Sequence, residues 1–301
     1  MSQEIAPSPK RNLFAQIFIS SDEPRLRAGW RLLIQTLILI LLGAVISIIG
    51  IGLGLDILTD NLIGGQILNL ILITGSVYIA RRWLDKRSFE SLGLRLDIQA
   101  LLDTLAGIGI TFIQMGFIYF VMHSLGWLTF EGFAWEFDPV NDVVTGVLTF
   151  LIGFILVGWN EELMSRGYHL QTIASGLNLF WGVVISSAFF GIAHLGNPNA
   201  TWVSAAGIFF AGIYLAYGYI RTKQLWLPIG LHIGWNFFEG VVFGFPVSGL
   251  DIYALTRIQV TGPELWTGGA FGPEAGLILL PSLIVGGVLI HIFTTHRNGN
   301  V

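Results

Sequence analysis

The chain has 301 residues, of which 53% are hydrophobic and only 11% are charged, and its mean hydropathy is +0.72. Soluble domains carry about 25% charged residues, so this composition excludes an ordinary soluble protein and predicts an integral membrane protein. The net charge of −4 is small and the basic residues fall in short loops, which argues against nucleic acid as a partner.

The first 29 residues are polar. They hold three prolines and a group of basic residues that includes Lys10, Arg11, Arg25 and Arg27. They lack the apolar core and small-residue cleavage site of a secretory signal near the start. The sequence therefore predicts a cytoplasmic N-terminal tail over residues 1–29 rather than a removed leader.

The rest of the chain is a succession of apolar runs, most of them near the roughly 20 residues that a helix needs to cross the hydrocarbon core. We expect an all-α, polytopic membrane protein with about eight transmembrane helices and no visible transporter-type repeat. The expected spans are 30–55, 62–80, 101–125, 143 to a turn at 175–178, 179–194, 202–220, 226–245 and 274–294.

The expected organisation follows from these spans. Three spans fall within 30–130, a core lies over 143–245, a Gly/Pro-rich loop covers 246–273, and the last span with the C-terminal tail occupies 274–301. Lys and Arg in short loops favour the cytoplasm, so both termini are predicted to be cytoplasmic and the 246–273 loop external. That loop is too long for an ordinary structureless connection. We expect it to be a partly ordered cap, with a flexible solvated loop as the alternative.

The most informative stretch reads G-W-N-E-E-L-M-S-R-G-Y and directly follows the apolar run 143–157. A charge in mid-membrane costs about 2.5 to 3.5 kcal/mol, which makes these residues a functional hypothesis. In a continuous helix Glu162 and Arg166 lie one turn apart and can neutralise each other. Glu161 then points about 100° away and is free for chemistry. The alternative is that both glutamates are solvated residues at a helix end.

Two histidines in other spans form a second pattern. Phe190 and His194 are one helical turn apart in F-F-G-I-A-H, and His232 and Asn236 are one turn apart in G-L-H-I-G-W-N, so each pair shares a helix face. A lone histidine in a helix is more often a packing residue, but two of them beside a glutamate pair favour a site.

Depth in the membrane supports the same grouping. If the fourth and fifth spans form an antiparallel hairpin about Gly176, Glu161 and His194 come out at nearly the same height. At a rise of about 1.5 Å per residue their offset is roughly 4 to 5 Å, which is within reach of their side chains. This arrangement requires the fourth helix to extend past the membrane core.

Such a group could hydrolyse an amide in two ways. A carboxylate facing an imidazole can hold and deprotonate a water, while a second imidazole and an amide donate hydrogen bonds to an oxyanion. Alternatively, Glu161, His194 and His232 could hold a catalytic zinc or another divalent metal, with water as the fourth ligand. The chain has no cysteine, so a thiolate nucleophile and cysteine metal ligands are excluded. The residues alone leave both mechanisms open.

The three motifs together resemble a known family. E-E-L-M-S-R, F-G-I-A-H and H-I-G-W-N match in order and spacing the EExxxR, FxxxH and HxxxN/D motifs of the CPBP (Abi) intramembrane proteases, which include type II CAAX prenyl endopeptidases and bacteriocin-processing enzymes. The resemblance covers about residues 143–243. It implies that the core over 143–245 is a protease core.

The resemblance also implies roles for single residues. Glu161 is similar to the water-activating glutamate of the family, and Glu162 and Arg166 complete its motif. His194 corresponds to the histidine that shares the water or metal with that glutamate. Both metalloprotease and metal-free glutamate mechanisms have been put forward for this family.

His232 and Asn236 resemble the pair that stabilises the oxyanion or contributes to metal binding. The expected function is therefore an intramembrane endopeptidase that cleaves a peptide or membrane-protein segment, surrounded by membrane lipid. The alternative is a non-catalytic membrane scaffold or small-solute transporter. It would use the same polar residues as structural hydrogen bonds or as a proton relay.

Overall fold

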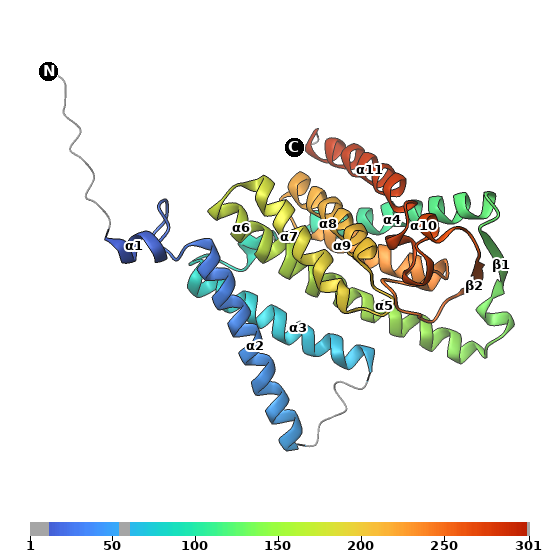
Figure 1. Ribbon diagram of the computed structural model, residues 1–301, viewed down its shortest axis with the longest axis horizontal. Helices are drawn as coiled ribbons and strands as arrows, with labels where there is room; N and C mark the ends of the chain where they lie inside the picture. Colours follow the sequence, from blue (N-terminus) through green and yellow to red (C-terminus); the bar gives the residue numbers. More distant parts are fainter. Residues whose placement is uncertain (1–11, 54–60, 300–301) are drawn as a thin grey trace.

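The computed structural model describes residues 12–53 and 61–299, which are mostly helical (Figure 1). Residues 1–11 of the expected N-terminal tail and 54–55 of the first expected span lie outside the described residues. The α-helices are α1 (Leu13–Phe18), α2 (Ala28–Leu53), α3 (Leu62–Ile79), α4 (Ile98–Ser124), α5 (Val140–Glu162), α6 (Leu170–Gly176), α7 (Leu179–Ala193), α8 (Trp202–Thr222), α9 (Trp226–Asn236), α10 (Glu264–Thr267) and α11 (Leu279–Gly299).

Short helical segments of other types and one small sheet make up the remaining regular structure of residues 12–53 and 61–299. The π-helical segments are η2 (Ala80–Leu84), η5 (Leu163–His169) and η7 (Phe237–Val242). The 3₁₀ turns are η3 (Glu90–Leu92), η4 (Ala134–Glu136), η6 (His194–Gly196), η8 (Gly269–Phe271) and η9 (Pro273–Ala275). The strands β1 (Leu128–Phe133) and β2 (Thr256–Val260) form a two-stranded antiparallel sheet.

Seven helical segments in the described part of the chain are long and apolar enough to cross a membrane, which confirms a multi-pass integral membrane protein. They are Ala28–Gly52, Leu62–Leu84, Ile98–Ser124, Val140–Gly176, Leu179–Gly196, Trp202–Thr222 and Leu279–Arg297. The other expected span, 226–245, is the shorter helix of α9 and η7. It is buried from Leu227 to Asn236, and its neighbours rather than lipid surround it.

The last span begins later than its apolar pattern indicates. Glu274, its expected first residue, lies in η9, and α11 starts only at Leu279. Gly268, Gly269 and Gly272 all have positive φ angles, which a right-handed helix does not accommodate. Glu274 therefore belongs to a turn that precedes the span.

One long helix organises the molecule. α5, η5 and α6 form a continuous run of 37 residues, which at 1.5 Å per residue is about 55 Å long and exceeds the roughly 30 Å hydrocarbon core. This confirms the expected extension past that core. The run turns π-helical at Leu163, directly after the two glutamates, and π-bulges within α-helices are frequent at functional sites.

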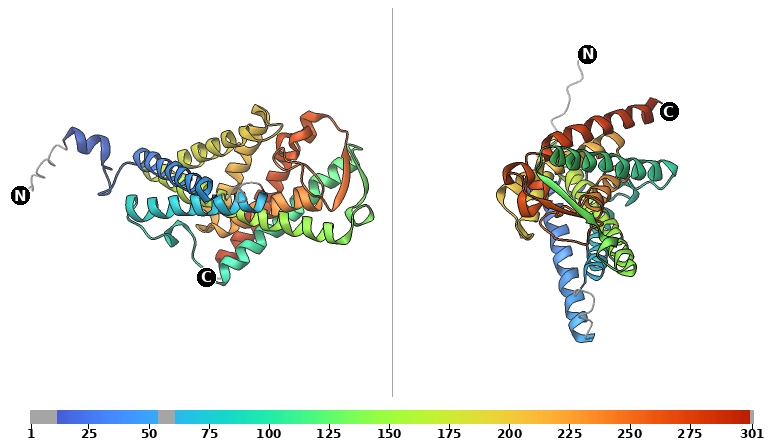
Figure 2. Two further views of the ribbon diagram at one scale, coloured as in Figure 1. Left: turned by 90° about the horizontal axis from the view of Figure 1, so that it is seen from below. Right: turned by 90° about the vertical axis from the view of Figure 1, so that its right-hand side faces the viewer.

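Basic residues gather at one end of the molecule. The buried carboxylate of Asp85 accepts hydrogen bonds from Arg31 and, at 3.1 Å, from Arg81, and Arg25 lies 3.6 Å away. Arg31 also donates to Ser175 at 2.7 Å, which joins the start of α2 to the end of α6. The β1–β2 sheet lies at the opposite end (Figures 1 and 2). That the basic end faces the cytoplasm remains a prediction.

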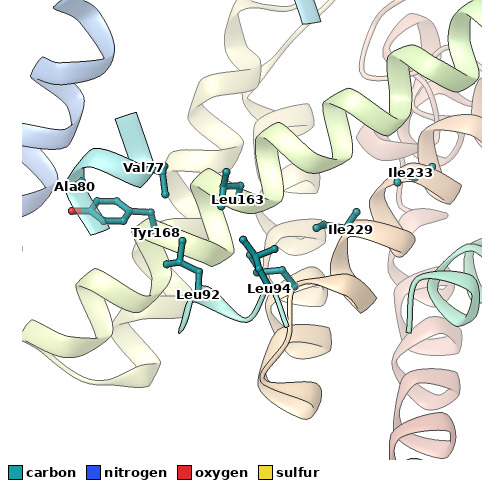
Figure 3. Packing of buried hydrophobic residues seen from close by; sticks show 9 residues of the cluster. Val77, Ala80, Leu92, Leu94, Leu163, Tyr168, Ile229 and Ile233 are labelled. Carbon is teal, nitrogen blue, oxygen red and sulfur yellow. The ribbon is translucent and has the colours of Figure 1, made fainter. Parts of the chain in front are cut away.

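An apolar cluster packs around the segment that carries Glu162 and Arg166 (Figure 3). Leu163 and Tyr168, on either side of Arg166, are fully buried. They pack against residues of α3, η2, the 85–97 segment and α9, namely Val77, Ala80, Leu92, Leu94, Leu225, Ile229 and Ile233. The 85–97 segment thus places two of its leucines inside the protein.

Glycines bring α9 against α4. A Cβ on Gly230 would meet the backbone carbonyl of Thr104, and one on Gly234 would meet the hydroxyl of Thr111. Small residues allow such close approach between membrane helices, where van der Waals packing drives association. Because Gly230 and Gly234 share one face, His232 lies on the opposite face, by the 3.6-residue period. Packing of α9 on α4 therefore directs His232 away from α4.

The 246–273 loop is ordered and, with β1 and η9, forms what we call the cap. β2 pairs with β1 from Leu128 opposite Val260 onward, with an irregularity between Phe130 and Gly132. Asp138 accepts hydrogen bonds from Arg257 at 2.6 Å and from the Tyr253 hydroxyl at 2.9 Å. The ordered cap agrees with the expectation from loop length.

Candidate active site

A cavity of about 380 Å³ lies between α3, α5, α7, α8, α9 and the cap. Much of its wall is apolar, but a set of polar side chains also lines it. These are Gln66, Asn160, Glu161, Ser165, His169, His194, Asn197, His232, Trp235, Asn236, Ser248 and Glu274. Four of the six residues singled out from the sequence thus face one cavity, and Glu162 and Arg166 lie buried behind its wall.

Glu161 is the carboxylate that reaches the cavity. Its Oε2 lies 3.8 Å from Nε2 of His194 and 3.7 Å from Nε2 of His232. The side chain is 34% exposed, yet this oxygen is buried and has no hydrogen-bond partner in the described part of the chain. The height argument that paired Glu161 with His194 is thereby confirmed in the structure.

Hydrogen bonds at the other ring nitrogens orient both imidazoles. Nδ1 of His194 lies 2.7 Å from the carbonyl oxygen of Phe190, and Nδ1 of His232 lies 2.8 Å from Oε1 of Glu162. Both acceptors require a proton on Nδ1, so each neutral ring turns its Nε2 lone pair toward the cavity. Two nitrogen lone pairs and one carboxylate oxygen therefore converge. A water that donates its protons, or a cation, fits between them.

Glu162 and Arg166 form the pair that their spacing predicts. Arg166 donates to Glu162 at 2.7 Å, and both side chains are essentially unexposed. A second guanidinium nitrogen of Arg166, Nη2, donates to the carbonyl oxygen of Gly212 at 3.1 Å. Glu162 thus bridges Arg166 and His232, a contact that the helical spacing of the pair could not indicate.

Phe190 is a central contact that the sequence analysis used only as a motif residue and as a marker of a helix face. The guanidinium of Arg166 lies 4.3 Å above its ring centroid, an arrangement typical of a cation–π interaction. Its ring also meets His194 edge to face at 4.7 Å and His232 at 6.0 Å between centroids. Phe190 therefore separates the buried arginine from the cavity and packs against both histidines.

Asn236 lies one turn after His232 and lines the cavity. It is 7% exposed, and no described residue forms a hydrogen bond with its side-chain amide. An asparagine amide carries two donors and one acceptor. The amide can therefore donate to a group that enters the cavity.

The donors fit a divalent metal by type, since zinc is commonly bound by imidazole nitrogen and carboxylate oxygen. Two ligands of a tetrahedral zinc with bonds of about 2.1 Å lie about 3.4 Å apart. Glu161 Oε2 and the two Nε2 atoms, at 3.7 and 3.8 Å, would need to approach slightly. Among the described residues, no group of three such side chains is already arranged as a metal site.

Two further buried carboxyl groups were not recognised in the sequence. Glu274 lines the cavity and accepts hydrogen bonds from Nε1 of Trp235 at 3.1 Å and from the Ser248 hydroxyl at 2.6 Å. Burial raises the pKa of the Glu274 carboxyl, and the hydrogen bond from Ser248 opposes that shift. Glu239 is fully buried, and neither of its carboxyl oxygens has a partner among the described residues.

The fold and the site together define a multi-pass membrane protein with a carboxylate and two histidines facing an internal cavity. Residues 143–238, which carry this site, match the family model described as "Type II CAAX prenyl endopeptidase Rce1-like". The matched residues include all three motifs through which the sequence resembles the CPBP proteases.

Two curated relatives match parts of the chain. The "Putative membrane peptidase YdiL" of Bacillus subtilis (strain 168) is 29% identical over 124 residues, which cover 41% of this chain and 49% of the relative. The "Uncharacterized 24.3 kDa protein" of Escherichia coli is 34% identical over 89 residues, 29% of this chain and 40% of the relative. The chain thus spans about half or less of the length of these relatives. No solved structure matches the chain significantly.

Proposed function

We propose that this protein is an intramembrane endopeptidase that hydrolyses a peptide bond of a membrane-associated peptide or protein. The observation that supports the proposal most is the convergence of Glu161 Oε2 with the Nε2 atoms of His194 and His232 in a cavity between apolar helices. Burial of charge inside a membrane protein is costly, and an unpartnered carboxylate oxygen at this position suits chemistry better than packing.

In this proposal a water lies between Glu161 and His194 and attacks the carbonyl carbon of the scissile bond. Glu161 takes the proton of the water as general base and then gives it to the leaving amine. The Nε2 lone pair of His194 accepts the other hydrogen bond of the water and fixes its orientation. This division of roles follows from the tautomer that the Phe190 carbonyl imposes on His194.

The developing oxyanion needs hydrogen-bond donors. Asn236 supplies its amide, which has no partner among the described residues. His232 can donate from Nε2 only as an imidazolium, so its part in oxyanion binding requires the doubly protonated ring. Glu162 positions that ring through Nδ1 and is itself held by Arg166.

A divalent metal remains an alternative way to supply the reactive water. Held by Glu161, His194 and His232, it would lower the pKa of a bound water and polarise the substrate carbonyl. Metal analysis of the purified wild-type protein beside Glu161→Gln and His194→Ala distinguishes the two cases. A stoichiometric metal that both substitutions remove supports the metal site, and metal-free protein with full activity supports the metal-free mechanism.

The experiment that tests the function uses the purified protein in liposomes with a mixed set of membrane-inserting peptides. Mass spectrometry identifies any product and the bond that was cut. The proposal expects cleavage by the wild-type protein and none by Glu161→Gln. Lack of cleavage across a broad peptide set would favour the non-catalytic scaffold or transporter instead.

A further inference from the structure

Acidic side chains line the cavity wall, and the described lining residues include no permanent cation. Among the described residues that line it there is neither lysine nor arginine, whereas Glu161 and Glu274 both face it. Arg166 belongs to the site, but its charge is already paired with that of Glu162. It is 1% exposed, lies behind Phe190, and donates to Glu162 and to the Gly212 carbonyl.

The position of Glu274 is specified by three separate parts of the fold. Trp235, next to Asn236 on α9, donates its indole N–H, and Ser248 of the cap donates its hydroxyl. A Cβ on Gly207 of α8 would meet the carbonyl oxygen of Glu274, so the turn packs directly on that helix. The carboxyl group is thereby held at a fixed place in the cavity wall.

A structural role does not account for the acid at this place. A glutamine could accept from Trp235 through its oxygen and donate from its NH₂ group to the Ser248 hydroxyl, without the cost of burying a carboxylate. An indole N–H can only donate, so Oε1 of Glu274 acts as an acceptor, which both the neutral and the ionised carboxyl allow. His194 and His232 lie within electrostatic range of this group. A cation that enters the cavity would favour the ionised form of this carboxyl, so Glu274 can place a negative charge opposite a basic side chain close to the reacting centre.

We propose that Glu274 is a substrate-recognition residue that selects peptides with a lysine or arginine side chain close to the scissile bond and disfavours peptides with a carboxylate there. The inference rests on the proposed endopeptidase function. It also implies that a substrate whose C-terminal carboxylate enters the cavity fits this chain poorly, since no lysine or arginine among the described lining residues receives that charge.

Binding to the Glu161→Gln protein tests this recognition without requiring cleavage. The probes are fluorescent peptides of one sequence that carry lysine, norleucine or glutamate at successive positions around the central bond. Because hydrogen bonds to charged groups are worth about 1.5 to 3 kcal/mol, lysine at the best position should bind at least about tenfold more tightly than norleucine. Glutamate at that position should bind more weakly than norleucine.

The double variant Glu161→Gln/Glu274→Gln should lose the lysine preference while it still binds the norleucine peptide. Ser248→Ala, in the Glu161→Gln background, is the matched control because it removes a hydrogen bond to Glu274 and keeps the charge. It should retain the preference, whereas a purely structural role of Glu274 predicts the same behaviour for both variants. If the Glu161→Gln protein bound the three peptides with equal affinity, or bound none of them, the inference would be overturned.

This design separates the inference from the proposed function. Lysine-dependent binding that needs Glu274, without cleavage by the wild-type protein, would support the recognition site and refute the endopeptidase. Cleavage of lysine and norleucine peptides with equal kcat/KM would support the endopeptidase and refute the recognition site. Should Glu274→Gln fail to fold, the peptide series on the single Glu161→Gln variant still gives the decisive comparison.

Discussion

The two adjacent glutamates are expected to differ sharply in what they contribute to stability. Glu162→Gln preserves the shape of a side chain that is unexposed and accepts hydrogen bonds from Arg166 at 2.7 Å and His232 at 2.8 Å. The amide oxygen can take the place of Oε1, and the NH₂ group then replaces Oε2, which has no partner in the described structure. The main loss is therefore the negative charge.

The size of that loss can be estimated in two ways. Removing one partner of a buried ion pair costs about 3 to 5 kcal/mol because the remaining charge is uncompensated. Translocon scales place a lone arginine at mid-membrane at about 2.5 to 3.5 kcal/mol. Solvent screening does not reduce these values appreciably, since the Glu162 and Arg166 side chains are 0% and 1% exposed. We expect a destabilisation of about 3 kcal/mol or more.

The assay is reversible unfolding of the purified protein in mixed micelles of increasing denaturing detergent, followed by circular dichroism. Glu161→Gln is the matched control, because Oε2 of Glu161 has no partner among the described residues and its side chain is 34% exposed. It should change the unfolding free energy by less than about 1 kcal/mol. Equal destabilisation by the two substitutions would refute the assignment of separate structural and chemical roles.

Three further predictions concern packing, the cap and topology. Gly230→Ala should destabilise by about 1 to 3 kcal/mol through overpacking against α4, whereas Gly109→Ala, whose Cβ has open space, should be nearly neutral in the same unfolding assay. Trypsin should cut the native protein slowly after Arg257. Asp138→Asn should speed that cut because the ion pair between Arg257 and Asp138 at 2.6 Å is lost. Equal rates would show that this pair does not hold the cap. Reporter domains fused after Arg82 should be cytoplasmic and reporters inserted in the cap external, and the reverse pattern would invert the topology.

Much of the site could be predicted because it depends on local helical geometry. The spacing of Glu162 and Arg166 is sufficient to pair them, and a hairpin of two helices sets the relative height of Glu161 and His194. The contact between Glu162 and His232 is different, since it spans 70 residues. It depends on the rotation of α9, which the close packing of its glycines on α4 decides.

The remaining features depend on contacts that no periodic pattern encodes. Glu274 reaches the cavity through a turn of glycines with positive φ, and its partner Trp235 is 39 residues away. The stretch predicted as the last span therefore began with Glu274, which belongs to the cap. The β1–β2 pairing likewise joins segments that lie on either side of the 143–245 core, so only the length of the loop hinted at an ordered cap.

The central claim is that Glu161 activates the attacking water, and the most direct measurement is kcat/KM for a cleaved peptide with wild type and Glu161→Gln side by side. General-base catalysis contributes typically 10² to 10⁴-fold, so the variant should lose activity by at least about 100-fold while it unfolds at the same detergent concentration as wild type. A folded Glu161→Gln protein that cleaves the peptide at the wild-type rate would contradict the account.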